Sequence, residues 1–157
     1  MTDMHASRGR RTFLASVVVL AGALALSLAA GASNATLRVT LDKWSHTVGA
    51  DAHSVSLAAK AQHPRRMTSS ALRFRRDALS ARRAIAAQHP STAAGRRGQK
   101  LALTAFADYA AAGSRWAATG RARVLKHRAA ASRSARAATT FATTGNRLLV
   151  AAAKLVR

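Results

Sequence analysis

Two prolines divide this chain and limit the structures that it can form. Pro64 and Pro90 are the only prolines among the 157 residues, and each ends the tetrapeptide Ala-Gln-His-Pro. A proline disfavours helix at the residue before it and suits the first turn of a new helix. Both prolines are therefore predicted to mark joints between helices, and the repeated tetrapeptide hints at an internal helical repeat. Ser91, directly after Pro90, could cap the helix that follows.

The stretches around these joints have the composition and periodicity of helices. About a quarter of the residues are Ala, which has the highest helix propensity, and no segment shows the sustained apolar–polar alternation of a half-buried strand. The sequence therefore predicts an all-α fold, a small antiparallel, up-and-down bundle of about four Ala-rich amphipathic helices. The predicted helices cover residues 37–62, 65–88, 91–119 and 121–156. The nearest alternative has three helices, the last of them long and continuous.

The clearest apolar stripe lies in the second predicted helix, where residues three and four apart share one face. Its members are Met67, Ala71, Phe74, Ala78, Ala81 and Ile85. Leu72 and Leu79 lie among arginines on the back of the same helix. They are the predicted contact points if the bundle associates with itself.

Glycines and one aspartate could end or bend the other predicted helices. The stripe of the first predicted helix has a gap between residues 48 and 55, where Gly49 or Asp51 could end the helix and Asp51 could cap a new one. Gly113 and Gly120 are predicted kinks or ends, because Gly weakens a helix by about 1 kcal/mol relative to Ala.

Large apolar residues are few enough that disorder is a rival to the bundle. Leu, Ile, Val and Phe make up 21 of the 122 residues after position 35, and a low content of these residues with a high net charge is typical of disordered chains. The helix propensity of Ala and Arg and the regular spacing of the large residues favour the bundle. We therefore expect a marginally stable bundle that binding to anions tightens.

Residues 1–35 have the features of an export signal, and residues 36–157 form the predicted basic helical domain. Three arginines, the last two at Arg10 and Arg11, precede an uncharged run over residues 12–37. Small residues then offer cleavage sites after positions 32 and 35. The alternative is an uncleaved membrane anchor, since the run exceeds the roughly 20 residues that span a bilayer. Either way, the bulk of the protein is predicted to lie outside the cytoplasm, in the cell envelope or secreted.

A short motif within this segment indicates a route of export. Arg10 and Arg11, followed one residue later by Phe13 and Leu14, resemble the bacterial twin-arginine export signal. The resemblance implies translocation by that pathway, with the general secretory route as the alternative. In composition, the whole chain resembles exported Ala- and Arg-rich proteins of high-GC bacteria.

Residue types that carry most enzyme chemistry are scarce in this chain. It has no Cys and no Glu, and its five acidic residues are scattered aspartates. This composition excludes disulfides and thiolate metal sites, and it argues against paired-carboxylate catalysis. His46 and His53 lie seven residues apart, too far for the usual pair of helical zinc ligands. The sequence therefore predicts no enzyme, no metal, no cofactor and no small-molecule substrate.

Basic residues are the remaining candidates for function, since the formal net charge is +21 and residues 36–157 keep 23 basic side chains against four acidic ones. Arginine binds phosphate and carboxylate with two parallel hydrogen bonds, and unpaired arginines create a positive potential. The predicted anion-binding residues are Arg65, Arg66, Arg73, Arg75, Arg76, Arg82, Arg83, Arg96, Arg97, Arg136, Arg147 and Lys154.

The leading hypothesis is an exported, non-enzymatic helical protein that associates electrostatically with anionic envelope polymers or with a membrane surface. An alternative is non-specific nucleic-acid binding through neutralised phosphates. A third hypothesis is a structural or partner-binding bundle that forms homo-oligomers through its Ala-rich faces.

Overall fold

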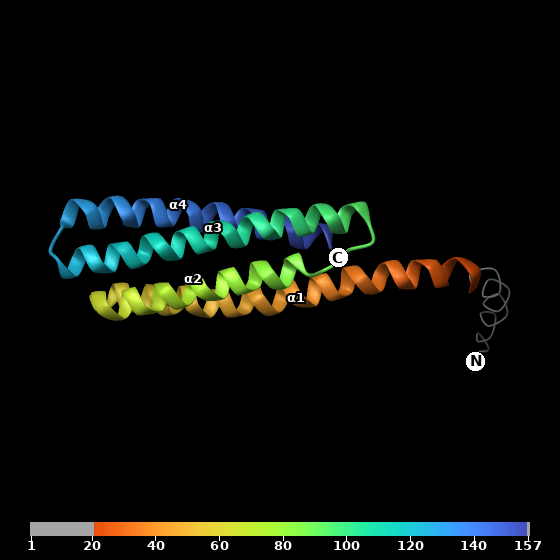
Figure 1. The fold of residues 1–157 in the computed structure, drawn as a ribbon, viewed down its shortest axis with the longest axis horizontal. Helices are drawn as coiled ribbons and strands as arrows, with labels where there is room; N and C mark the ends of the chain where they lie inside the picture. The colour runs from red at the N-terminus through yellow and green to blue at the C-terminus, as the bar shows by residue number, and fades with distance from the viewer. Residues whose placement is uncertain (1–20, 157) are drawn as a thin grey trace, which may run out of the picture.

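Four helices make up the structure, a computed structural model that describes residues 21–156, with side chains from Ser33 onward. They are α1 (Ala21–Lys60), α2 (Pro64–Ala86), α3 (Ala93–Val124) and α4 (Arg128–Leu155). Consecutive helices run in opposite directions (Figure 1). The predicted all-α class and the bundle of four helices are confirmed for this part of the chain.

Several predicted helix ends are wrong. α1 continues without a break through Gly49 and Asp51, so Asp51 caps no new helix. α3 likewise runs through Gly113 and Gly120 to Val124, instead of ending near residue 119. A turn over residues 125–127 then separates α3 from α4, which contradicts the three-helix alternative.

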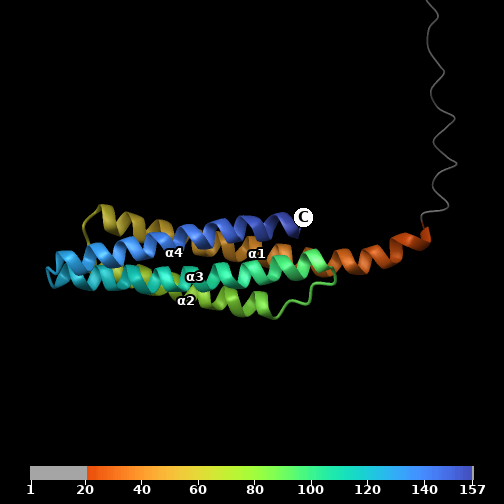
Figure 2. The same cartoon turned by 90° about the horizontal axis from the view of Figure 1, so that it is seen from above.

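α3 is the central helix of the bundle. It packs extensively on α2 and on α4, whereas α1 packs mainly on α2 and only slightly on α3. Figure 2 shows α3 between α2 and α4. Small residues of α3 are buried on two of its faces, toward α2 and toward α4. The small buried residues of α3 include Gly95, Gly98, Ala102, Ala105, Ala112, Thr119 and Gly120.

The apolar stripe of α2 is confirmed in full, since all six of its predicted members are buried. Phe74 lies at its centre, with its ring centroid 5.2 Å from that of Trp116 and 5.9 Å from that of Tyr109, both in edge-to-face geometry. Such pairs stabilise by about 0.5–1.5 kcal/mol beyond the area they bury. Contacts between aromatic side chains therefore join α2 to α3.

Helices α2 and α3 approach closely because a glycine of α3 faces the backbone of α2. A Cβ atom added at Gly113 would lie 2.8 Å from the Cβ of Arg75 and 3.0 Å from the carbonyl oxygen of Ala71. Gly145 of α4 faces α3 in the same way, since a Cβ atom added there would lie 3.0 Å from the carbonyl oxygen of Ala105. Gly113 is therefore a contact residue and not the predicted kink.

The two turns at one end of the bundle have the same backbone geometry. Gln62 and Lys126 both adopt a left-handed conformation, with φ of 53° and 58°. In each turn the next residue donates its backbone N–H to a carbonyl five residues earlier, His63 to Ala58 and His127 to Ala122. This is the Schellman ending of a helix. The structural repeat therefore relates residues 61–63 to 125–127, whereas the tetrapeptide at 87–90 lies in a different loop.

The start of α3 is tied to α1 by hydrogen bonds between side chains. Thr92 caps α3 by accepting a hydrogen bond from the backbone N–H of Gly95 at 2.9 Å, so the helix cap predicted at Ser91 lies one residue later. Asn34 of α1 donates to the same Thr92 hydroxyl at 2.8 Å, and Ser33 donates to Ser91 at 2.8 Å. These contacts place residues 33 and 34 within the folded bundle.

The predicted export motif, Arg10, Arg11, Phe13 and Leu14, lies outside the residues that the structure describes. Across residues 21–156, none of the four helices combines the length and the apolar character that a bilayer-spanning helix requires.

Candidate anion-binding surface

All twelve predicted anion-binding side chains are exposed, but the structure does not gather them into one site. Arg65 and Arg66 lie at the start of α2, whereas Arg96 and Arg97 lie at the start of α3, at the opposite end of the bundle. The others are distributed along α2 and α4. They are Arg73, Arg75, Arg76, Arg82, Arg83, Arg136, Arg147 and Lys154.

Two of the predicted arginines are already engaged by aspartates. Arg73 donates from Nε to Oδ1 of Asp51 at 2.7 Å, and Nε of Arg76 lies 3.5 Å from Oδ1 of Asp77. These pairs lower the charge that the middle of α2 offers to an external anion. The contact between Arg73 and Asp51 also joins α2 to α1.

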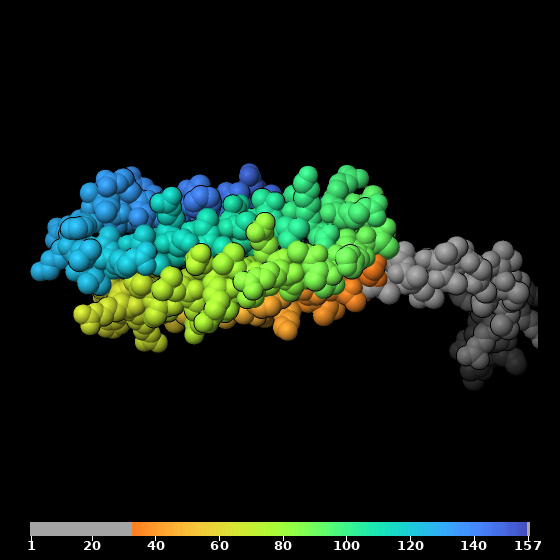
Figure 3. Space-filling model, in the orientation of Figure 1, coloured from red at the N-terminus to blue at the C-terminus, as the bar shows by residue number. Residues whose placement is uncertain are grey.

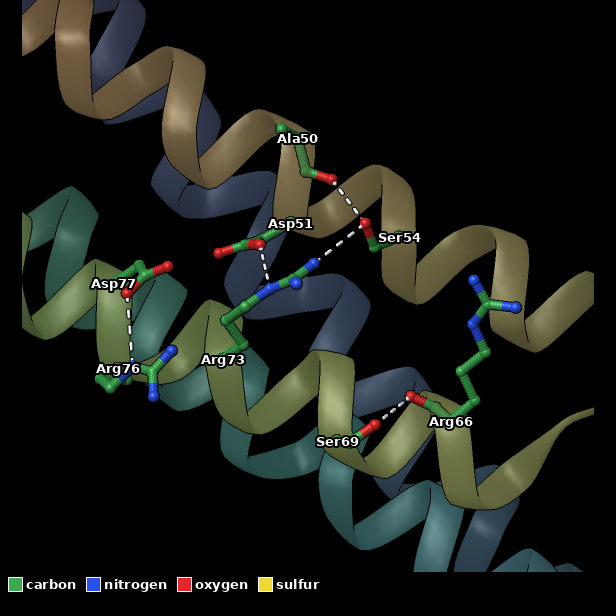
Figure 4. A network of polar contacts seen from close by, with 8 residues as sticks. All are labelled: Ala50, Asp51, Ser54, Arg66, Ser69, Arg73, Arg76 and Asp77. Carbon is green, nitrogen blue, oxygen red and sulfur yellow. Dashed lines mark hydrogen bonds and ion pairs between the residues drawn. The ribbon is translucent and has the colours of Figure 1, made fainter.

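Asp51 occupies the gap that the sequence shows in the apolar stripe of α1. Although Asp51 is an acidic residue, its side chain is only 8% exposed, and it lies between the buried Val48 and Val55. Figure 4 shows its carboxyl group facing that of Asp77, with Arg73 beside it. Oδ2 of Asp51 is buried and accepts no hydrogen bond from any residue that the structure describes.

The surroundings of Asp51 shift its pKa upward. Burial raises the pKa of Asp51 above its ordinary value of 3.8, and the facing carboxyl of Asp77 raises it further, while the Arg73 guanidinium lowers it in part. A proton on Oδ2 would let Asp51 donate a hydrogen bond toward Asp77 and so satisfy the buried oxygen. Asp51 is therefore a polar contact between α1 and α2 with a raised pKa.

A group of unpaired basic side chains lies at the end of the bundle that carries the two Schellman turns. Figures 1 and 3 show both turns at this same end. We call this surface the loop end. Lys60 also lies there, at the end of α1, and the six basic residues that define the loop end are Arg65, Arg66, Arg121, Arg123, Lys126 and Arg128. All six are exposed, and none is ion-paired with an aspartate of residues 21–156.

Shallow grooves bring the loop-end residues of separate helices together. One groove is lined by Arg65 and Arg66 from α2 and by Arg123 and Lys126 from the end of α3 and its turn. A second is lined by Arg65 with Arg121. A third joins Arg123 and Lys126 to Arg128 of α4. An anion in any of these grooves would lie within reach of cations from two segments.

Four of the six loop-end residues were missed by sequence reasoning. Arg121, Arg123, Lys126 and Arg128 fall in one stretch of eight residues, 121–128, and short runs this rich in Lys and Arg are a recognised sign of an anion-binding patch. The run was missed because residues 121–156 were predicted to form one helix, which would spread these side chains around its surface.

Leu79 is also placed differently from its prediction. It is half-buried against the core, whereas Leu72 is exposed as expected. His46 and His53 are both exposed on α1. Within residues 21–156, no three His or Asp side chains lie close enough to hold a metal ion together.

No protein-family model matches the chain, and neither the curated proteins nor the solved structures include one that is similar to it. The function is therefore inferred from the residues of the surface themselves.

Proposed function

We propose that the protein is an exported, non-enzymatic helical protein that binds anionic components of the cell envelope through its loop end. The observation that carries the proposal is the group of six exposed basic side chains there, unpaired with any aspartate that the structure describes. Like charges held this close repel one another, and an anionic partner relieves that repulsion. The five arginines among them favour phosphate and carboxylate ligands, because a guanidinium group can donate two parallel hydrogen bonds to either.

Export in this proposal depends on residues 1–35, which end near the first contacts of the bundle. Cleavage after Ala32 would keep Ser33 and Asn34, whose side chains bind residues just before α3, whereas cleavage after Ala35 would remove both. The proposal therefore places the cleavage after Ala32. Sequencing the N-terminus of the native protein tests this choice, and a mature chain that begins at Thr36 contradicts it.

Fractionation of the producing cells tests the proposed location and mode of attachment together. The protein is expected in the envelope fraction at low salt, and a wash at high salt should release it. Salt acts in this way because the Debye length falls from about 10 Å at 0.1 M to about 3 Å at 1 M. Recovery of the native protein from the nucleoid would favour nucleic-acid binding instead. Retention that survives high salt would assign attachment to residues 12–37 as an anchor.

A pair of matched variants separates the loop end from general positive charge. Arg123→Gln with Lys126→Gln removes two charges at the loop end, and Arg82→Gln with Arg83→Gln removes two exposed charges from α2. The first pair is expected to release the protein at lower salt than the second does. Equal release by both pairs would contradict a binding role for the loop end.

A further inference from the structure

The loop end exposes large apolar side chains as well as basic ones. Val124 is 44% exposed at the last residue of α3, and Leu125 is 63% exposed in the turn that follows. Single exposed apolar residues are common on protein surfaces, but these two are adjacent and are flanked by Arg123 and Lys126. The turn therefore presents an apolar tip within a basic surface.

The structure joins this apolar tip to the basic grooves. Val124 and Leu125 line a groove together with Arg65, Thr68 and Arg121, so aliphatic and guanidinium groups share one concave surface. Val124 also lines the adjoining groove with Arg123 and Lys126. A partner that fills these grooves must offer both negative charge and apolar surface.

We propose that the loop end docks end-on onto an anionic lipid bilayer, with Val124 and Leu125 entering the interface and the basic residues contacting headgroups. This inference rests on the proposed binding of anionic envelope components, and it names the bilayer surface as the component. Lipid headgroups supply the negative charge, and the acyl chains beneath them accept the two apolar side chains.

The exposed apolar tip and the shape of the loop end favour a bilayer over a soluble polyanion. A polysaccharide or nucleic acid would neutralise the arginines but would leave Leu125 in water, because neither offers an aliphatic phase. Both turns lie at the same end of the elongated bundle, and the turn between α3 and α4, which contains Leu125, extends farther than the other (Figure 1), so it can reach a flat surface. Long Arg and Lys side chains can keep their charges at headgroup level while their stems lie along apolar surface.

Vesicle binding by the full-length chain tests the role of the apolar tip. Vesicles of phosphatidylglycerol mixed with phosphatidylcholine are compared with phosphatidylcholine alone, which measures any binding through the apolar N-terminal run. Val124→Ser with Leu125→Ser is expected to weaken binding to the anionic vesicles by about tenfold, because two partly exposed aliphatic side chains no longer leave water. The matched control is Val39→Ser with Leu72→Ser, one Val and one Leu that are 67% and 45% exposed elsewhere.

A label at the loop end shows directly whether this surface enters the bilayer. The chain has no Cys, so Leu125→Cys provides one unique site for an environment-sensitive dye, and Val39→Cys provides the control site. With anionic vesicles, the emission of the dye at position 125 is expected to shift to the blue and to be quenched by lipid-borne quenchers. The dye at position 39 is expected to change little.

The results separate this inference from the proposed function. If both serine pairs weaken binding equally, or if the vesicles bind while the dye at position 125 stays in water, the bilayer inference is overturned and electrostatic binding stands. A blue shift with a soluble polyanion alone, or on raising the protein concentration without lipid, also overturns it in favour of a polymer or a second copy. A chain that binds neither anionic vesicles nor soluble polyanions contradicts the proposed function itself.

Discussion

Replacing two glycines by alanine separates helix propensity from helix packing in this bundle. Gly113 of α3 and Gly49 of α1 both lie inside helices, so each Gly→Ala change gains about 1 kcal/mol of helix propensity. A Cβ at Gly49 would meet nothing within 4 Å. Gly49→Ala is therefore expected to raise the free energy of unfolding by about 1 kcal/mol.

At Gly113 the same change meets the backbone of α2. The added Cβ would lie 2.8 Å from the Cβ of Arg75, and 3.0 Å from both its backbone nitrogen and the carbonyl oxygen of Ala71. These atoms cannot rotate away, so α2 and α3 must separate and loosen the side chains between them. Overpacking of this kind costs about 1–3 kcal/mol, which at its midpoint exceeds the propensity gain by about 1 kcal/mol.

The two variants are therefore expected to differ in stability by about 2 kcal/mol, with Gly113→Ala the less stable. For a chain of this size, that difference corresponds to melting temperatures separated by about 4–8 °C. Thermal and urea unfolding followed by the helical circular dichroism signal measures it. If Gly113→Ala proves as stable as Gly49→Ala, the close approach of α2 and α3 described above is wrong.

Two further changes test polar contacts of the fold. The pKa of Asp51 is raised in the folded state, so that state binds more protons than the unfolded chain between pH 3.8 and the raised pKa. The free energy of unfolding therefore falls as the pH rises through this window, and Asp51→Asn is expected to remove this dependence. Urea titrations across that window measure the slope, and an equal slope in the variant would rule out Asp51 as its source. Thr92→Ala removes the cap of α3 and the partner of Asn34, and it is expected to cost about 1 kcal/mol. The same change at the exposed Thr104, which donates only to a carbonyl of its own helix, is the control and should cost far less.

The apolar stripe of α2 could be predicted because the residues on its two faces differ strongly in polarity. Six apolar residues share one face, and arginines fill most other angles, so the helical period is visible in the sequence alone. The second buried face of α3 gives no such contrast, because it consists of small residues such as Gly98, Ala102 and Ala105. Ala and Gly occupy both buried and exposed positions in this bundle, so only the positions of the neighbouring helices show which of them are buried.

The loop end was harder to predict for a related reason. The turn at residues 125–127 contains no Gly or Pro, and Lys126 adopts a left-handed conformation without either signal. Without a predicted turn, the basic residues on its two sides fall on one predicted helix, residues 121–156. Asp51 was missed as a buried contact because its partner Arg73 lies on the next helix, 22 positions away in the sequence.

The order of packing in the bundle has a consequence for how the chain folds. Extensive contacts join only α1 to α2, α2 to α3 and α3 to α4, which are neighbours in the sequence, through loops over residues 61–63, 87–92 and 125–127. Folds dominated by such local contacts have low contact order and fold quickly. Each helix after the first packs on the helix that precedes it in the sequence. The chain can therefore acquire its structure hairpin by hairpin, while its C-terminal residues are still being synthesised.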